Sequence, residues 1–241
     1  MAQVVRYLDS DDLAERVAAR LLEALAGFQT DDRVAQICLT GGRIAMRVYS
    51  RLAELVSGSE LDPSRLELWW GDERFVPTDD PERNAGPTIA ALAGSFALDP
   101  ARTHPMPAAD GVIDAGASAA TYARELGDTR FDLCLLGMGP DGHVASIFPG
   151  HPSEEPTTQT VIGVSDAPKP PAERISLTLP TLSRSAQVWF VVSGADKAEA
   201  VARALAGDES LPAARVHGEE GTFWLIDRAA ASRLPYFECS L

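Results

Sequence analysis

The sequence lacks the features that would place it in a membrane or in an oxidising compartment. No apolar run approaches the length of a membrane-spanning helix, and the first ten residues carry no basic-then-apolar signal pattern. Cysteine is scarce, and Cys38, Cys134 and Cys239 form neither a disulfide framework nor a metal-ligand spacing. Cys38 and Cys134 fall inside apolar runs, so we expect both to be buried. These absences favour a cytoplasmic protein without a metal site.

Basic residues are also fewer than acidic residues. The chain has 21 basic against 35 acidic residues, which gives a formal net charge of −14. Nucleic acids and anionic membranes bind proteins through clustered Lys and Arg, so we expect neither as a partner. An anionic metabolite would need a local positive pocket, which draws attention to single Arg and Lys residues beside glycine-rich turns.

Apolar residues are abundant enough for the whole chain to fold, since they make up 45% of it. We expect residues 1–241 to form a single domain, because no compositional change flanks the Pro-rich stretch around Pro170. Strand-like apolar runs alternate with amphipathic stretches. The expected strands are 4–7, 34–40, 66–70, 131–136, 174–177, 188–192 and 223–226, and the expected helices are 11–27, 45–56, 83–98, 115–126 and 197–205. This alternation predicts an α/β fold with a mostly parallel sheet covered by helices on both faces.

Four glycine-containing segments follow predicted strands. They are Thr40-Gly41-Gly42-Arg43, Gly71-Asp72-Glu73-Arg74, the segment from Gly137 to His143, and Ser193-Gly194-Ala195-Asp196-Lys197. Ligands of open parallel sheets bind beyond the carboxyl ends of the strands. Each segment combines glycine, which allows close backbone approach, with a polar or charged side chain. The recurrence predicts a ligand site built from these four segments.

The first two segments each allow two interpretations. Thr40 to Arg43 runs into a helix start whose free N–H groups suit a phosphate, but it is equally consistent with a tight turn that needs two glycines. It is neither a Walker motif nor a dinucleotide fingerprint, which argues against a nucleotide cofactor. The triplet Asp72-Glu73-Arg74 is either an internal ion-pair cluster or a group that binds sugar hydroxyls and charge.

His143 is the leading candidate for catalysis. It follows three glycines at what we expect to be a strand-to-helix turn, and imidazole titrates near neutral pH, which suits a general base. Asp141 is one candidate to orient the ring, although side chains at i and i+2 do not face each other on a helix. Asp72 is the other candidate for that role.

The other histidines and one lysine are less clearly assigned. We expect His104 and His217 to be structural, and the interpretation of His151 stays open. Lys197 lies at a predicted helix start, where a cation opposes the helix dipole. A bound phosphate would explain this position, and a solvated surface lysine is the alternative.

Taken together, these residues resemble the 6-phosphogluconolactonase family from Val34 to about Ala231. The long histidine motif is the most specific part of the likeness. The matching segments are Leu39-Thr40-Gly41-Gly42, Trp70-Gly71-Asp72-Glu73-Arg74-Phe75-Val76-Pro77 with Asn84, Leu136-Gly137-Met138-Gly139-Pro140-Asp141-Gly142-His143-Val144-Ala145-Ser146-Ile147-Phe148-Pro149-Gly150, Arg174-Ile175-Ser176-Leu177-Thr178, Ser193-Gly194-Ala195-Asp196-Lys197, and Pro212-Ala213-Ala214-Arg215-Val216.

The resemblance implies a Rossmann-like sheet and an enzyme that needs no metal or organic cofactor. It implies hydrolysis of a phosphosugar lactone, with His143 as general base and Asp141 and Asp72 as supporting catalytic residues. The implied substrate and phosphate contacts are Thr40, Gly41, Gly42, Arg43, Arg74, Gly139, Arg174 and Lys197. The family's Gly-Gly-Ser-Thr-Pro loop is Gly41-Gly42-Arg43-Ile44-Ala45 here, so the serine and threonine hydroxyls are lost. Arg43 either replaces them or points away.

Two other functions compete with the lactonase hypothesis. A sugar-phosphate isomerase or deaminase on the same sheet would also need a histidine and acids. A non-catalytic sugar-phosphate-binding module would use the same segments without chemistry, although such sensors usually carry a DNA-binding domain for which the chain has no room before Val34. The oligomeric expectation is a monomer or a weak homo-oligomer.

Overall fold

A parallel β-sheet forms the centre of the protein. The computed structural model describes residues 2–111 and 114–235, so Cys239 lies outside the described residues. The sheet has the strand order β1-β10-β9-β6-β2-β3-β5, and all of its neighbouring strands run parallel. The strands are β1 (Gln3–Tyr7), β2 (Ala35–Leu39), β3 (Leu66–Trp70), β5 (Thr103–His104), β6 (Phe131–Leu136), β9 (Ser185–Val192) and β10 (Gly221–Asp227).

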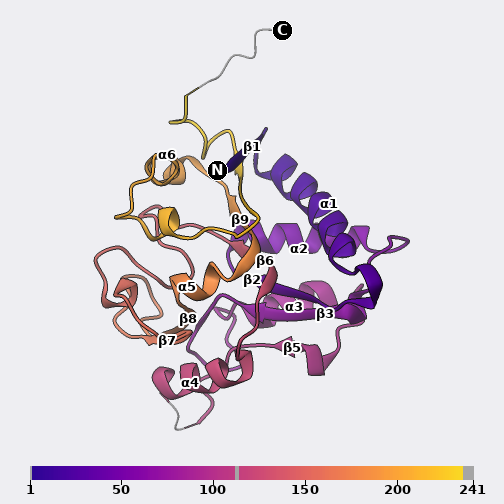
Figure 1. Ribbon diagram of the computed structural model, residues 1–241, viewed down its shortest axis with the longest axis horizontal. Coiled ribbons are helices and arrows are strands. Elements are labelled where there is room, and N and C mark those ends of the chain that lie inside the picture. Colours follow the sequence, from indigo (N-terminus) through magenta and orange to yellow (C-terminus); the bar gives the residue numbers. More distant parts are fainter. Residues whose placement is uncertain (1, 112–113, 236–241) are drawn as a thin grey trace.

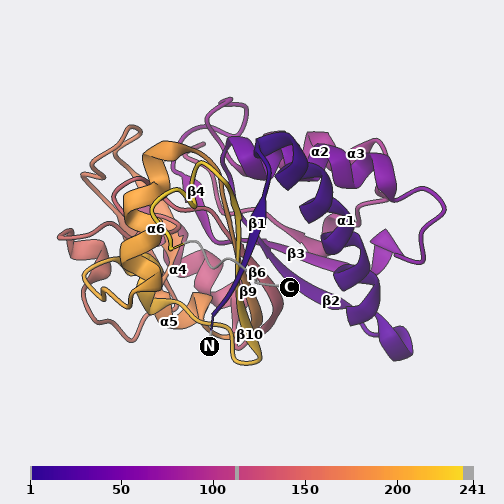
Figure 2. The ribbon, with the colours of Figure 1, turned by 90° about the horizontal axis from the view of Figure 1, so that it is seen from above.

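Helices cover both faces of this sheet, as predicted (Figures 1 and 2). One face carries α1 (Ser10–Phe28), α2 (Arg43–Leu55) and α3 (Ala85–Ala93), and the other carries α4 (Ala115–Leu126), α5 (Leu179–Leu182) and α6 (Ala198–Leu205). The side chains of each strand alternate between the two layers. In β6, Leu133 and Leu135 pack with α1 to α3, whereas Cys134 and Leu136 pack with α4 to α6. Because both faces are buried, the strand is apolar almost throughout.

A second, antiparallel sheet corrects part of the prediction. The segment expected to be a loop at Asp72 forms strand β4 (Asp72–Arg74), which pairs with β8 (Arg174–Leu177). Strand β7 (Val161–Val164), which was not predicted, completes this sheet beside β8. Residues 174–177 are therefore a strand as expected, but they lie outside the parallel sheet. A charged three-residue strand has too little apolar alternation to be recognised from sequence.

Four of the five predicted helices have different ends in the structure, and the largest difference is in α3, which ends at Ala93 rather than at Leu98. Helix α3 begins at Ala85 rather than at Arg83, because the buried Glu73 carboxylate accepts the N–H groups of Asn84 and Ala85 at 2.6 and 3.0 Å. Helix α1 continues through Gly27 to Phe28. The predicted burial of Cys38 and Cys134 is confirmed, since neither is exposed to solvent.

The chain leaves the adjacent strands β2 and β6 in opposite directions. After β2 it forms α2, whose Val48 packs on the face of α1 and α3. After β6 it crosses to the other face, where Val144 and Ile147 are buried. Ligands bind at such a divergence, beyond the carboxyl ends of the strands. The fold thus brings residues 40–43 and 137–143 together.

Candidate functional site

A cavity of about 530 Å³ opens where the predicted segments meet. Ten of the eleven expected site residues line it: Thr40, Gly41, Gly42, Arg43, Asp72, Arg74, Gly139, His143, Arg174 and Lys197. The eleventh, Asp141, contacts His143 instead. Sequence reasoning missed Ser10, Arg47 and Lys169, which also line the cavity. The volume is within the usual range for a small-molecule site.

His143 and Asp141 form a pair at the cavity wall. Nδ1 of His143 lies 2.6 Å from Oδ1 of Asp141, and the imidazole is 17% exposed. No helix follows β6, contrary to the prediction; residues 137–150 form an irregular turn closed by the N–H of Gly139, which donates to the carbonyl of His143 at 2.9 Å. Outside a helix, side chains at i and i+2 can face each other. Asp141, and not Asp72, is therefore the acid that contacts the ring.

The pairing fixes which ring nitrogen faces the substrate space. Burial disfavours the charged form of Asp141, but the hydrogen bond with His143 and the charges of His143 and Lys169 outweigh it, so the pKa of Asp141 lies well below its usual value. An ionised carboxylate can only accept, which assigns the proton to Nδ1 of His143. Nε2 has no hydrogen-bond partner within residues 2–111 and 114–235. Its lone pair is therefore available to a water or a substrate group.

Successive side chains of β4 point in opposite directions, so the three residues of the triplet Asp72-Glu73-Arg74 do not share one environment. Asp72 and Arg74 line the cavity, whereas Glu73 is fully buried, holds the start of α3 and pairs with Arg83 at 3.5 Å. The carboxylate of Asp72 accepts from Ser146 Oγ at 2.7 Å and from Asn84 Nδ2 at 3.3 Å. Glu73 thus belongs to an internal ion pair, whereas Asp72 and Arg74 face the cavity, where a ligand could contact them.

The turn after β2 directs the start of α2 at the cavity. Both backbone groups of Thr40 bond to the Tyr49 hydroxyl, and Thr40 Oγ1 accepts the N–H of Gly137 at 3.3 Å. Gly41 is required because a Cβ there would lie 1.9 Å from Oδ1 of Asn84. Gly42 begins the helix at φ +98°, a conformation that favours glycine. The first N–H groups of α2 have no intrahelical partner, so they remain available to an anion.

Cations surround this helix start in an otherwise acidic protein. The cavity is lined by the six basic residues Arg43, Arg47, Arg74, Lys169, Arg174 and Lys197, against the acids Asp72 and Asp196. Arg43 has no ion-pair partner in the part of the chain that the structure describes. Lys197 pairs with Asp196 at 3.2 Å. The local positive pocket that the net charge requires for an anionic ligand is therefore present.

Residues of the remaining motifs support the turn from outside the cavity. Ala213 donates its N–H to the carbonyl of Gly142 at 3.1 Å, and Leu211 packs against Gly142. Arg215 pairs with Glu154 at 3.2 Å, and the same carboxylate accepts the N–H of Gly150 at 2.7 Å. The segment 212–216 thus holds the histidine turn at Gly142, within it, and at Gly150, its last residue.

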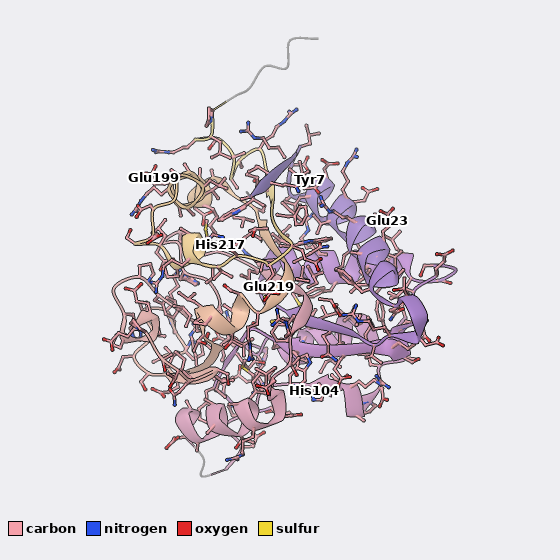
Figure 3. The ribbon with its side chains drawn as sticks, viewed as in Figure 1. Tyr7, Glu23, His104, Glu199, His217 and Glu219 are labelled. Atoms are coloured by element: carbon pink, nitrogen blue, oxygen red, sulfur yellow. The ribbon has the colours of Figure 1, made fainter. Side chains whose placement is uncertain are left out.

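The other three histidines do not line the cavity; Figure 3 labels two of them, His104 and His217. His104 on β5 bonds to Glu67 and Glu125 at 2.7 and 2.6 Å and stacks on Trp69, so it is structural as expected. His217 lies in the segment before β10 and is exposed. His151 bonds to Ser153 and to the carbonyl of Ser165.

The described residues offer neither a metal cluster nor a membrane-spanning helix. Within residues 2–111 and 114–235, no group of three or more His, Cys, Asp or Glu is placed to hold a metal ion. None of the helices in these ranges combines the length and the apolar character needed to cross a bilayer.

Similarity to known proteins agrees with the geometry. The sequence model of the glucosamine-6-phosphate isomerases/6-phosphogluconolactonase family matches residues 8–224. The 6-phosphogluconolactonase of Streptomyces coelicolor is 47% identical, with 97% of this chain and 95% of the relative covered. That of Mycobacterium leprae is 40% identical, with coverages of 97% and 99%. The crystal structure of 6-phosphogluconolactonase from Thermotoga maritima superposes with a TM-score of 0.83 at 27% identity, covering 94% of this chain and all of the other.

Proposed function

Because the chain belongs to the family of glucosamine-6-phosphate isomerases and 6-phosphogluconolactonases, we propose that it hydrolyses 6-phospho-D-glucono-1,5-lactone to 6-phospho-D-gluconate. The expected class, an enzyme acting on a sugar lactone, is confirmed by the curated relatives at 40 and 47% identity. The observation that carries the reaction is the Asp141–His143 pair at the wall of a cavity lined by cations.

His143 acts as the general base in this proposal. Its free Nε2 takes a proton from water as the water oxygen attacks the lactone carbonyl carbon, and the imidazolium then returns the proton to the departing ring oxygen. Asp141 holds the ring and stabilises the imidazolium, as the acid of a triad does. Asp72, already fixed by Ser146 and Asn84, positions substrate hydroxyls or the attacking water.

The oxyanion that forms when water attacks the lactone carbonyl needs a hydrogen-bond donor. The hydrogen bonds already made within the protein exclude some of the candidate donors. The N–H groups of Gly137, Gly139 and Gly142 already donate within the protein, at 3.3, 2.9 and 3.0 Å. Arg74 lines the cavity; its Nη1 donates to the carbonyl of Glu82, and its Nη2 has no hydrogen-bond partner within residues 2–111 and 114–235. Arg74 is therefore the preferred donor, and one such donor contributes about 3 kcal/mol to the transition state.

The phosphate binds at the start of α2 in this proposal. The turn Thr40 to Arg43 supplies N–H groups, and Arg43 and Lys197 supply charge from two different segments that line the cavity. Arg43 lines the cavity and is free of ion pairs with described residues, which supports the view that it replaces the missing hydroxyls. Arg174 contributes less, since its Nε and Nη2 donate to backbone carbonyls.

The wider proposal places the reaction in the pentose phosphate pathway, in the cytoplasm. It has residues 1–241 acting as one domain, as a monomer or weak homo-oligomer, on a phosphosugar lactone without nucleic acid, membrane or cofactor. The contribution of both sheets to one cavity supports the single domain.

Asp141→Asn should lower kcat by about tenfold to a hundredfold, a part of the general-base contribution.

The same variant should also change how the free energy of unfolding depends on pH. The folded-state pKa of Asp141 is lowered from 3.8, so its contribution to stability is present above that pH and is lost as pH falls through the folded value. Urea unfolding at pH 7 and at pH 3 checks this: the wild type should be more stable at pH 7 and the difference should shrink at pH 3. A difference that stays constant or grows on acidification would contradict the lowered pKa of Asp141.

A single assay tests the proposed function against its rivals. Freshly made 6-phosphogluconolactone is followed by acid release with and without protein, because the lactone also hydrolyses spontaneously. The lactonase proposal requires a rate well above this background. Ammonia release from glucosamine 6-phosphate would instead favour the deaminase, and tight binding of the phosphosugar without turnover would favour the binding module.

A further inference from the structure

The two lysines of this chain have an unusual distribution. Of 21 basic residues, 19 are arginine and only Lys169 and Lys197 are lysine, yet both line the cavity. Every other basic residue of the chain is therefore an arginine. The lysine ammonium, a compact group with three rotatable donors, occurs only at this cavity. Lys197 is assigned to phosphate in the proposed function. Lys169 has no role in it.

Lys169 completes a three-membered cluster with the proposed base. Its Nζ lies 3.4 Å from Oδ1 of Asp141 and 3.4 Å from Nδ1 of His143. Nδ1 donates its proton to Asp141, so it cannot also accept one from the lysine. The contact between Lys169 and the ring is therefore one of charge, and it is made at Nδ1 rather than at the free Nε2.

The loop that carries Lys169 is held in place by a buried residue. Arg174 on β8 is 5% exposed and donates to the carbonyls of Lys169, Pro170 and Pro171 at 3.0, 3.1 and 3.0 Å. The N–H of Ala167 closes the base of the loop on the carbonyl of Ala172 at 3.0 Å. Proline at 168, 170 and 171 further restricts the backbone. The backbone of residue 169 is therefore held beside the Asp141–His143 pair.

We propose that Lys169 is a positioning residue for the hydrolysis, which offsets the charge of Asp141 so that His143 stays unprotonated, and that Arg174 anchors it. A carboxylate alone orients the ring but also favours the imidazolium, which cannot accept a proton from water. A cation beside Asp141 and His143 preserves the orientation of the ring and makes the imidazolium less favourable. The kinetic part of this inference rests on the proposed function.

Other charges near His143 come from three elements. Asp72 and Arg74 on β4 line the same cavity, and the guanidinium of Arg174 lies 5.7 Å from the Phe148 ring, which itself lies 4.6 Å from the imidazole. The ring centroid of His151 lies 6.0 Å from that of Phe148. Within the described residues, only Asp141 and Lys169 contact the ring through charged atoms. A variant at 169 therefore changes the nearest cation and leaves the other charges in place.

The test compares Lys169→Met with Lys169→Arg, which keeps the charge, and with Lys197→Met, which removes the other lysine. In Lys169→Met, the acidic limb of the kcat/KM profile should move to higher pH by roughly 0.5 to 1 unit. On that limb kcat/KM should fall about threefold to tenfold, while the high-pH plateau stays. Lys169→Arg should restore most of the profile, and Lys197→Met should raise KM without moving the limb.

A titration by nuclear magnetic resonance makes the test independent of turnover. The chain has four histidines, and the His143 resonance is identified by its loss in His143→Ala. Its midpoint should rise in Lys169→Met and return in Lys169→Arg. An unchanged midpoint, or an equal change in Lys197→Met, would overturn the role of Lys169 even if the lactone is hydrolysed. Absence of lactone hydrolysis by the wild type would overturn the proposed function, whatever the titration shows.

Discussion

Replacing His143 with alanine should lower kcat for the lactone by about a hundredfold to ten-thousandfold, the range that general-base catalysis contributes. KM should change little, because the cations at the start of α2 remain in place. The free Nε2 is the only group that the proposal assigns to proton transfer. The rate is measured at neutral pH with the spontaneous hydrolysis subtracted, and substrate-analogue binding is measured separately.

His217→Ala is the matched control for this variant. His217 lies in the segment before β10, is exposed and does not line the cavity, so its replacement should leave turnover unchanged (Figure 3). Circular dichroism and thermal unfolding establish that His143→Ala is folded. Turnover of folded His143→Ala close to that of the wild type would sink the general-base mechanism.

The layers of the fold could be predicted because burial on both faces leaves a clear pattern. The strand at Leu66–Trp70 and the helix at Ala115–Leu126 have the same ends in the sequence and in the structure. The small sheet could not be predicted, because β4 pairs with a strand about a hundred residues away and its three residues are charged. Such pairing depends on tertiary contacts and leaves no local period.

The sequence predicts those parts of the site in which glycine follows a strand. The segments at Thr40, Asp72 and His143 each end a strand at the same edge of the sheet, so the topology brings them together. Lys169 lies in a Pro-rich stretch with no such signal, and its approach to His143 depends on the anchor from Arg174. The sequence alone does not choose between Asp141 and Asp72 as the partner of His143, because a helix at this place would separate the side chains of Asp141 and His143. The structure has an irregular turn there, in which Asp141 contacts the ring.

Gly139→Ala should lower kcat by about a hundredfold, because it displaces the catalytic pair without removing either member. A Cβ at 139 would lie 2.0 Å from Nδ1 of His143 and 2.3 Å from Oδ1 of Asp141, distances that real Cβ contacts essentially never show. Both side chains must therefore move, and a misplacement of about 1 Å in a catalytic group can cost a hundredfold in rate. Gly139 has no positive φ, so alanine introduces no backbone strain.

Gly137→Ala separates this displacement from the simple loss of glycine in the same turn. Its φ is likewise not positive, but a Cβ there would meet Oγ1 of Thr40 at 3.9 Å, which is ordinary van der Waals contact. Gly137→Ala should therefore keep turnover within about threefold of the wild type, whereas Gly139→Ala should lose most of its turnover. The loss in Gly139→Ala should appear in kcat with both variants folded, and the His143 resonance should move in that variant alone. Equal losses in the two variants would mean that the turn needs glycine for flexibility, and that contact with the Asp141–His143 pair is not the reason glycine is required at 139.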